Sequence, residues 1–107
     1  MASLSTHVLD TASGRPAVGV HIVLESESGA VVGEGATDAD GRVSGLGPEP
    51  LPQGDYRLRF HTGAWYALRG AATFYPEVVV TFTVAADEHH HVPLLLSPFG
   101  YSTYRGS

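Results

Sequence analysis

The sequence predicts an all-β protein, an antiparallel β-sandwich with one short helix. Three observations support this fold class: about seven or eight short stretches in which apolar and polar residues alternate, turn-forming residues roughly every ten positions, and a single stretch with helical spacing. A chain of 107 residues is short enough for one domain, so we expect a single domain over residues 1–107.

The composition argues against several classes of function. The net charge is −5, there is no lysine, and the six cations are all arginines, so no basic patch for nucleic acid is expected. The chain contains no cysteine, which removes disulfides and thiolate ligands. The N-terminal residues lack the pattern of a secretory leader, and no apolar run approaches the ~20 residues of a membrane span. We therefore expect a cytoplasmic protein without membrane or nucleic-acid partners.

The first expected strand covers residues 3–10. Its residues alternate in polarity, and successive side chains of a strand point to opposite faces of the sheet. If Leu4, Thr6 and Val8 face the core, His7 lies on the outer face.

Four further strands are expected before residue 61. They cover residues 18–24, 30–37, 42–43 and 56–60. The first of these has a regular apolar row from Val18 to Leu24, whereas the second is weakened by two glycines. Residues 38–41 lie between the strand at 30–37 and Arg42. They end in Asp-Gly, a pair that favours positive φ and predicts a tight turn. Residues 44–54 are expected to form a loop.

One short helix is expected within residues 61–70. Thr62 can cap its start, Trp65 and Leu68 share a face, and Gly70 can end it. Three more strands complete the sandwich. They are expected to begin at Pro76, His89 and Phe99, and the last of them is expected to continue to the end of the chain.

The histidine run in the strand from residue 89 is the most unusual feature of the sequence. Alternation places His89 and His91 on one face and His90 on the other, with the apolar residues that follow on the side of His90. Pro93 has no N–H, so the strand is interrupted or is an edge at that point. Three interpretations remain open for the histidines: a zinc site, a solvated run at a strand start, and acid–base chemistry.

The last strand follows the same alternation. Tyr104 and Gly106 share one face, so Tyr104 and the carboxylate of Ser107 could lie near His7 and His91. The outer sheet faces that carry these residues can be covered only by another subunit. Taken alone, Tyr104 and Arg42 would be interpreted as ordinary surface residues.

Three motifs resemble those of the 5-hydroxyisourate hydrolases, the enzymatic branch of the transthyretin family. They are LSTHVLD at residues 4–10, TDADGR at 37–42, and the segment 91–107, which begins HVPLLL and ends in YRGS. The resemblance covers essentially the whole chain. It implies a prealbumin-like sandwich of two four-stranded sheets with a helix between the fifth and sixth strands.

The resemblance also implies the site. The catalytic residues would be His7, Arg42 and His91, and substrate would be bound by His7, Arg42, Tyr104, Arg105, Gly106 and Ser107, with no metal and no cofactor. The sites would lie between the dimers of a homotetramer. The family often has His-Tyr-His where this chain has a third histidine, His90, which we expect to be tolerated because it points to the other face.

The implied reaction is the hydrolysis of 5-hydroxyisourate, the unstable product of urate oxidation, to 2-oxo-4-hydroxy-4-carboxy-5-ureidoimidazoline in purine catabolism. Imidazole titrates near ~6.5 and can act as a base at neutral pH. We expect His7 to be the base and His91 its partner, although the two roles are interchangeable on the sequence. Arg42 would stabilise the developing negative charge. The alternatives are a transthyretin-like carrier of small molecules and a zinc-binding sandwich.

Overall fold

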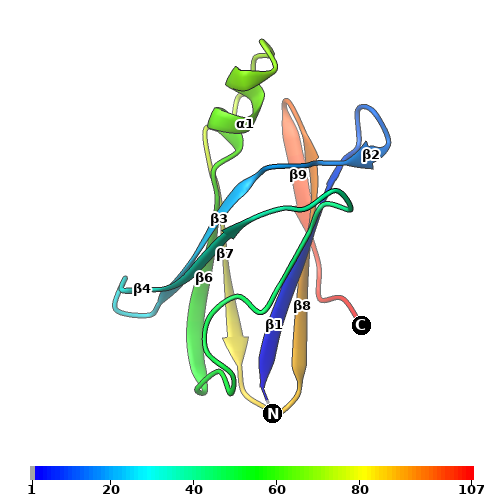
Figure 1. The fold of residues 1–107 in the computed structure, drawn as a ribbon. Helices are drawn as coiled ribbons and strands as arrows, with labels where there is room; N and C mark the ends of the chain where they lie inside the picture. Colours follow the sequence, from blue (N-terminus) through cyan, green and yellow to red (C-terminus); the bar gives the residue numbers. More distant parts are fainter. Residues whose placement is uncertain (1) are drawn as a thin grey trace.

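The computed structural model describes residues 2–107, which form two β-sheets packed face to face with a helix at one end (Figure 1). The first sheet contains β1 (Ser3–Asp10), β2 (Arg15–Pro16), β5 (Arg42–Ser44), β8 (His89–Ser97) and β9 (Gly100–Thr103). The second contains β3 (His21–Ser26), β4 (Val31–Ala36), β6 (Gly54–Phe60) and β7 (Val78–Val84), and α1 (Thr62–Leu68) lies between β6 and β7. The predicted sandwich with one short helix is confirmed. Among these residues, no helix is long and apolar enough to cross a membrane.

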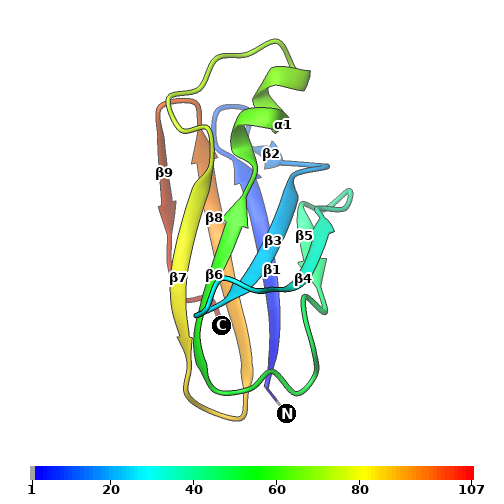
Figure 2. The same ribbon diagram turned by 90° about the vertical axis from the view of Figure 1, so that its left-hand side faces the viewer.

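The first sheet differs from the expectation in its number of strands and in the direction of one strand pair, whereas the strand order was not predicted. The second sheet has the order β4-β3-β6-β7 and is antiparallel throughout. The first has the order β2-β1-β8-β9, and β5 also pairs with β1, so it has five strands in place of four. In addition, β1 and β8 are parallel. A parallel pair requires a long connection, and the whole second sheet is inserted between these two strands (Figure 2).

Alternation along β1 and β8 builds the core side of the first sheet. Leu4 and Val8 are fully buried, as are Leu94 and Leu96 on the neighbouring strand. Full burial of each such side chain contributes about 1.5–3 kcal/mol to folding. The buried hydroxyl of Thr6 donates a hydrogen bond of 2.6 Å to the Val92 carbonyl and is therefore satisfied. The predicted inward and outward faces of both strands are confirmed.

The strand predicted from residue 18 begins later, at His21. Val18 is 43% exposed and belongs to the loop that receives the helix. Its carbonyl accepts hydrogen bonds from Trp65 Nε1 at 2.9 Å and from Arg69 Nη2 at 3.2 Å. The predicted start of the strand was therefore wrong, because the Val18 carbonyl is hydrogen-bonded to helix side chains and not to a neighbouring strand.

The helix starts without the predicted side-chain cap. His61 occupies the N-cap position and makes no side-chain cap hydrogen bond. The hydroxyl of Thr62 is buried and donates to the Tyr75 carbonyl at 2.8 Å, so it joins the helix to the loop that follows. The prediction of Thr62 as the cap was wrong.

Only part of the predicted helix face is buried. Trp65 is 5% exposed, whereas Leu68 is 86% exposed. The helix stands at the end of the sandwich, and its last turn extends beyond the sheets (Figure 1). The predicted end is confirmed, since Gly70 follows the helix with φ +65°.

Candidate active site

A tight turn places Arg42 beside β1. The carboxylate of Asp38 accepts hydrogen bonds from the backbone N–H groups of Asp40 at 2.8 Å and Arg42 at 3.0 Å. These two bonds, the one from Arg42 first, lower the pKa of the Asp38 carboxyl. Gly41 closes the turn with φ +74°, as the Asp-Gly pair predicts. The first residue of β5 then lies opposite His7.

Gly41 also holds the turn against β1. Its carbonyl accepts the Val8 N–H at 2.7 Å. A Cβ atom at Gly41 would lie 2.5 Å from the Val8 carbonyl oxygen, so only glycine allows this approach. The guanidinium-bearing residue is thereby fixed next to His7 by backbone contacts.

The C-terminal segment runs along the other side of β8. β9 ends at Thr103, and the chain pairs again at Gly106, whose N–H donates to the His91 carbonyl at 2.9 Å. The same antiparallel register continues from β9 to this bridge, so Tyr104 lies opposite Pro93. The prediction of a continuous strand to the last residue was wrong, although the terminus is attached to the sheet.

Pro93 explains the gap in this pairing. Alternate peptide groups of β8 point to its two neighbours: the Val92 carbonyl accepts from Thr6 on β1, and the Pro93 carbonyl accepts from the Thr103 hydroxyl at 2.7 Å. The missing N–H of proline therefore falls on the side of the C-terminal segment. As a result, pairing with β1 is complete while the ladder with the terminus is interrupted, as the sequence led us to expect.

These pairings produce two rows of residues on the outer face of the first sheet, the face turned away from the core. One row runs Arg42, His7, Pro93, Tyr104, and the next runs Ser44, Ser5, His91, Gly106. Neighbouring strands are about 4.8 Å apart, so each row spans roughly 14 Å. Both expected catalytic imidazoles thus lie on one open face, between the guanidinium of β5 and the C-terminal segment.

The ring of His91 packs against Gly106. A Cβ atom at this glycine would overlap Cδ2 of the ring and lie 3.2 Å from Cγ. Its φ angle is outside the positive range, so the requirement for glycine comes from the imidazole and not from the backbone conformation.

The surroundings of His91 disfavour its protonated form. The side chain is half-buried, and burial is the main reason why its pKa is lowered, followed by electrostatic interactions with Arg42, His7 and His89. Its Nδ1 is 2.8 Å from Ser5 Oγ. A neutral ring with one nitrogen fixed in this way can use Nε2 for proton transfer.

Comparison with known proteins agrees with this arrangement. Residues 4–106 match the family model described as "HIUase/Transthyretin family". The chain belongs to this family. It is 48% identical over 109 residues to a protein of Salmonella dublin named 5-hydroxyisourate hydrolase, with 97% of this chain and 80% of that protein covered.

Two solved structures of the HIUase/Transthyretin family show the same fold. The 5-hydroxyisourate hydrolase of Klebsiella pneumoniae superposes with a TM-score of 0.94 at 42% identity, with complete coverage of both chains. Sea bream transthyretin, solved in complex with thyroxine, superposes with a TM-score of 0.89 at 31% identity, covering 96% of this chain and 93% of that one. The chain therefore resembles both branches in fold and the hydrolases more closely in sequence.

Two serines of β1 and a second histidine of β8 lie near His91 on the outer face. Ser3 and Ser5 share the outer face with His7, and the parallel register places them opposite His89 and His91. The alternation of β1 gave a signal for these two serines, since it places them on the histidine face. Their contacts could not be predicted, because the parallel pairing of β1 and β8 is not visible in the sequence.

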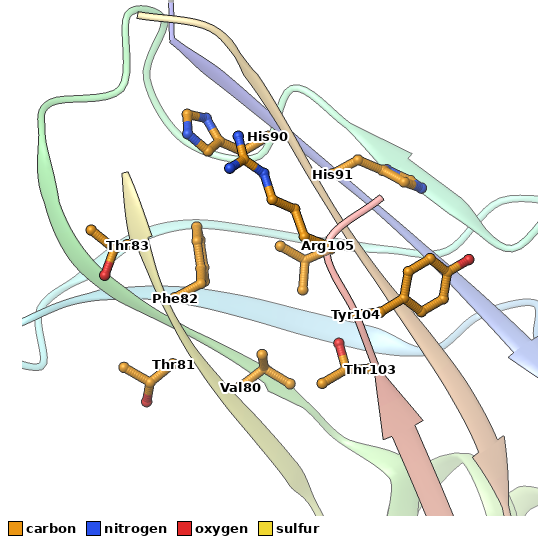
Figure 3. Close-up of a pocket in the computed structure, with 10 residues that line it drawn as sticks. Val80, Thr81, Phe82, Thr83, His90, His91, Thr103, Tyr104 and Arg105 are labelled. Carbon is orange, nitrogen blue, oxygen red and sulfur yellow. The ribbon is translucent and has the colours of Figure 1, made fainter. Parts of the chain in front are cut away.

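Arg105 is not brought to this face. Its guanidinium pairs with Glu88, and Figure 3 shows it beside His90, whereas His91 and Tyr104 point the other way. Arg105 and His90 line a cavity of about 250 Å³ between the edges of the two sheets. The other lining residues are 80–83, 91–92 and 103–104, so His91 and Tyr104 also border this cavity. His90 is 6% exposed, on the inner side of β8 as predicted, and its Nδ1 has no hydrogen-bond partner within residues 2–107.

Ser107 is exposed and lies one residue beyond the bridge at Gly106.

The zinc interpretation of the histidine run can be compared with the side-chain positions. Among residues 2–107, no three His, Asp or Glu side chains are grouped so that they could hold a metal ion.

Proposed function

We propose that this protein hydrolyses 5-hydroxyisourate to 2-oxo-4-hydroxy-4-carboxy-5-ureidoimidazoline, a step of purine catabolism, on the outer face of the first sheet. The observation that carries the proposal is the juxtaposition of two imidazoles and a guanidinium. His7 lies directly opposite Arg42 on one side, and on the other side His91 lies two residues before Pro93, the residue of β8 that is opposite His7. The identity to named hydrolases over nearly the whole chain favours this activity over a carrier role.

Two histidines can divide the proton transfers of amide hydrolysis. In the proposed mechanism His7 removes a proton from the attacking water, and His91 gives a proton to the nitrogen that leaves when the ring C–N bond breaks. The lowered pKa of His91 supports its use as a neutral group beside the cation that forms on His7. Either transfer alone typically accelerates a reaction ~10²–10⁴-fold.

Arg42 supplies the positive charge. Water addition to a carbonyl produces an oxyanion, and a guanidinium fixed in advance at that point stabilises it without reorganisation. The turn held by Asp38 and Gly41 provides this fixed position. Tyr104 and Ser107, on the opposite side of the two histidines, are proposed to hold the flat heterocycle by hydrogen bonds. Arg105 is proposed to reach the substrate only if its side chain leaves Glu88.

The same proposal includes a homotetramer built as a dimer of dimers. Within residues 2–107, β7 and β9 end their sheets on the same side of the sandwich (Figure 2), and Phe99 and Tyr101 beside them are exposed. A second copy that pairs with both edges would protect them. A second dimer would cover the outer face and close the site. Light scattering in solution tests this, and four chain masses are expected.

Side chains provide the base, the proton donor and the charge needed, so we propose that turnover requires no metal. Activity after exhaustive chelation tests this point. A cytoplasmic location stays a prediction.

The test of the function is the ultraviolet decay of freshly generated 5-hydroxyisourate, followed with and without the protein. We expect the decay to be accelerated in proportion to protein concentration, with the ureidoimidazoline as the product detected by NMR. If the decay rate equals that of the buffer alone and the compound binds saturably, the protein is a carrier and the proposed hydrolase activity is wrong.

A further inference from the structure

A chain of hydrogen-bonded side chains leads away from His91. Its Nδ1 is 2.8 Å from Ser5 Oγ, which is 2.7 Å from His89 Nε2, and His89 Nδ1 is 2.6 Å from Ser3 Oγ. The four residues alternate between hydroxyl and imidazole. They lead from the half-buried His91 to His89, which is exposed.

The hydrogen bonds of such a chain can all be donated in one direction or all in the opposite direction. A neutral imidazole has one donor and one acceptor nitrogen, and a hydroxyl has one donor, so every group must point the same way along the chain. When Ser5 donates to His91 Nδ1, the proton of His91 is on Nε2, facing the site. When His91 Nδ1 donates to Ser5, Nε2 carries a lone pair. Reversal of the chain therefore converts His91 from a proton donor to a proton acceptor without changing its charge.

The charges around His91 make this property useful. Cationic or titratable groups lie on the same face in every neighbouring element: Arg42 on β5, His7 on β1, His89 on its own strand, and Tyr104 on the C-terminal segment. Protonation of His7 during the reaction adds one more positive charge beside it. An imidazolium at position 91 is then disfavoured, and a neutral imidazole is a strong enough acid only if its second nitrogen gains a proton at the same time.

We propose that Ser5, His89 and Ser3 act as a proton relay that lets His91 donate a proton as a neutral side chain. This inference rests on the proposed hydrolysis. Ser5, His89 and Ser3 are positioning and proton-supplying residues, because they act on the substrate only through His91.

The protons balance over the cycle. His91 Nε2–H passes to the leaving nitrogen as the C–N bond breaks, and His91 Nδ1 takes the proton of Ser5. Ser5 Oγ takes the Nε2 proton of His89, His89 Nδ1 takes the proton of Ser3, and Ser3 Oγ takes one from solvent. The reverse passage, with a proton entering at His91 Nε2 and another leaving at Ser3, restores the starting polarity.

Two variants separate the relay from simple packing. Ser5→Ala removes the central hydroxyl, and His89→Gln keeps hydrogen-bonding groups near the position of Nε2 but cannot pass a proton. We expect each to lower kcat on the order of tenfold with an unchanged KM, since part of one acid–base contribution is lost. Ser44→Ala is the matched control, because Ser44 lies opposite Ser5 on β5 and is exposed.

A readout without substrate distinguishes this proposal from the proposed function. In nitrogen NMR of the ligand-free protein, we expect the tautomer of His91 to change in both Ser5→Ala and His89→Gln and to stay the same in Ser44→Ala. If the wild-type protein hydrolyses 5-hydroxyisourate but either variant keeps the wild-type kcat, or the wild-type His91 tautomer, the relay is refuted. If the wild type is inactive, the proposed function fails whatever the NMR result.

Discussion

Gly106 lies directly opposite His91, and the imidazole occupies the space that any side chain at position 106 would need. Gly106→Ala is therefore expected to push the ring aside while the sheet remains intact. A displacement of about 1 Å can reduce a rate by roughly 10²-fold, and we expect kcat to fall by that order. Gly100→Ala is the control, since its added Cβ would meet only Ser97 Oγ, at 3.5 Å. Equal activity of the two variants would contradict the packing of His91 on the terminus.

The two expected catalytic histidines can be tested together. His7→Ala and His91→Ala should each lower kcat by ~10²–10⁴-fold, because each removes one acid–base group. Thermal unfolding should remain close to that of the wild type, since both side chains lie on the outer face. His21→Ala, on the exposed face of the second sheet, should retain full activity. Near-normal turnover in both site variants would exclude the proposed mechanism.

Asp38 acts on the site through the backbone of Arg42. Asp38→Ala removes the acceptor for two backbone N–H groups and loosens the turn, so we expect lower kcat through poorer placement of the guanidinium. An effect of roughly tenfold is expected for loss of part of an oxyanion interaction. Asp40→Ala is the matched control, because it keeps the backbone N–H that donates a hydrogen bond to the Asp38 carboxylate. The prediction fails if both variants show the same kcat.

The lowered pKa of His91 predicts a pH dependence of stability. The folded protein binds this proton less readily than the unfolded chain, in which the pKa of histidine is about 6.5. The resulting loss of stability begins as the pH falls through about 6.5 and is complete below the folded pKa, while nothing is lost at higher pH. His91→Gln should flatten the dependence in this window, measured by urea unfolding between about pH 4.5 and 7.5. A steeper decline in the variant would contradict the assignment.

The faces of the strands were predictable because a strand's side chains alternate with a fixed period. That rule placed His7 and His91 on the outer side and Leu94 in the core, and all three positions are confirmed. Tyr104 and Gly106 keep their predicted parity even though the strand itself stops at Thr103, because the register continues across the gap.

What alternation does not determine is which strands become neighbours. The contacts of Ser3 and Ser5 arise from the parallel pairing of β1 with β8, which has no local signal. Long-range contacts also overturned local rules at the ends of elements. Val18 and Thr62 had the sequence features of a strand residue and a helix cap, but each is committed to a tertiary hydrogen bond.

The pairing of β1 with β8 links the candidate site to the folding of the whole chain. The hydrogen bond between Ser3 and His89 joins residues 86 positions apart. Contacts of such long sequence separation form slowly, after much of the chain entropy has been lost. An ordered second sheet alone would contain neither imidazole of the site. Catalytic activity regained during refolding should therefore follow the slowest phase, in which the first and last thirds of the polypeptide come together.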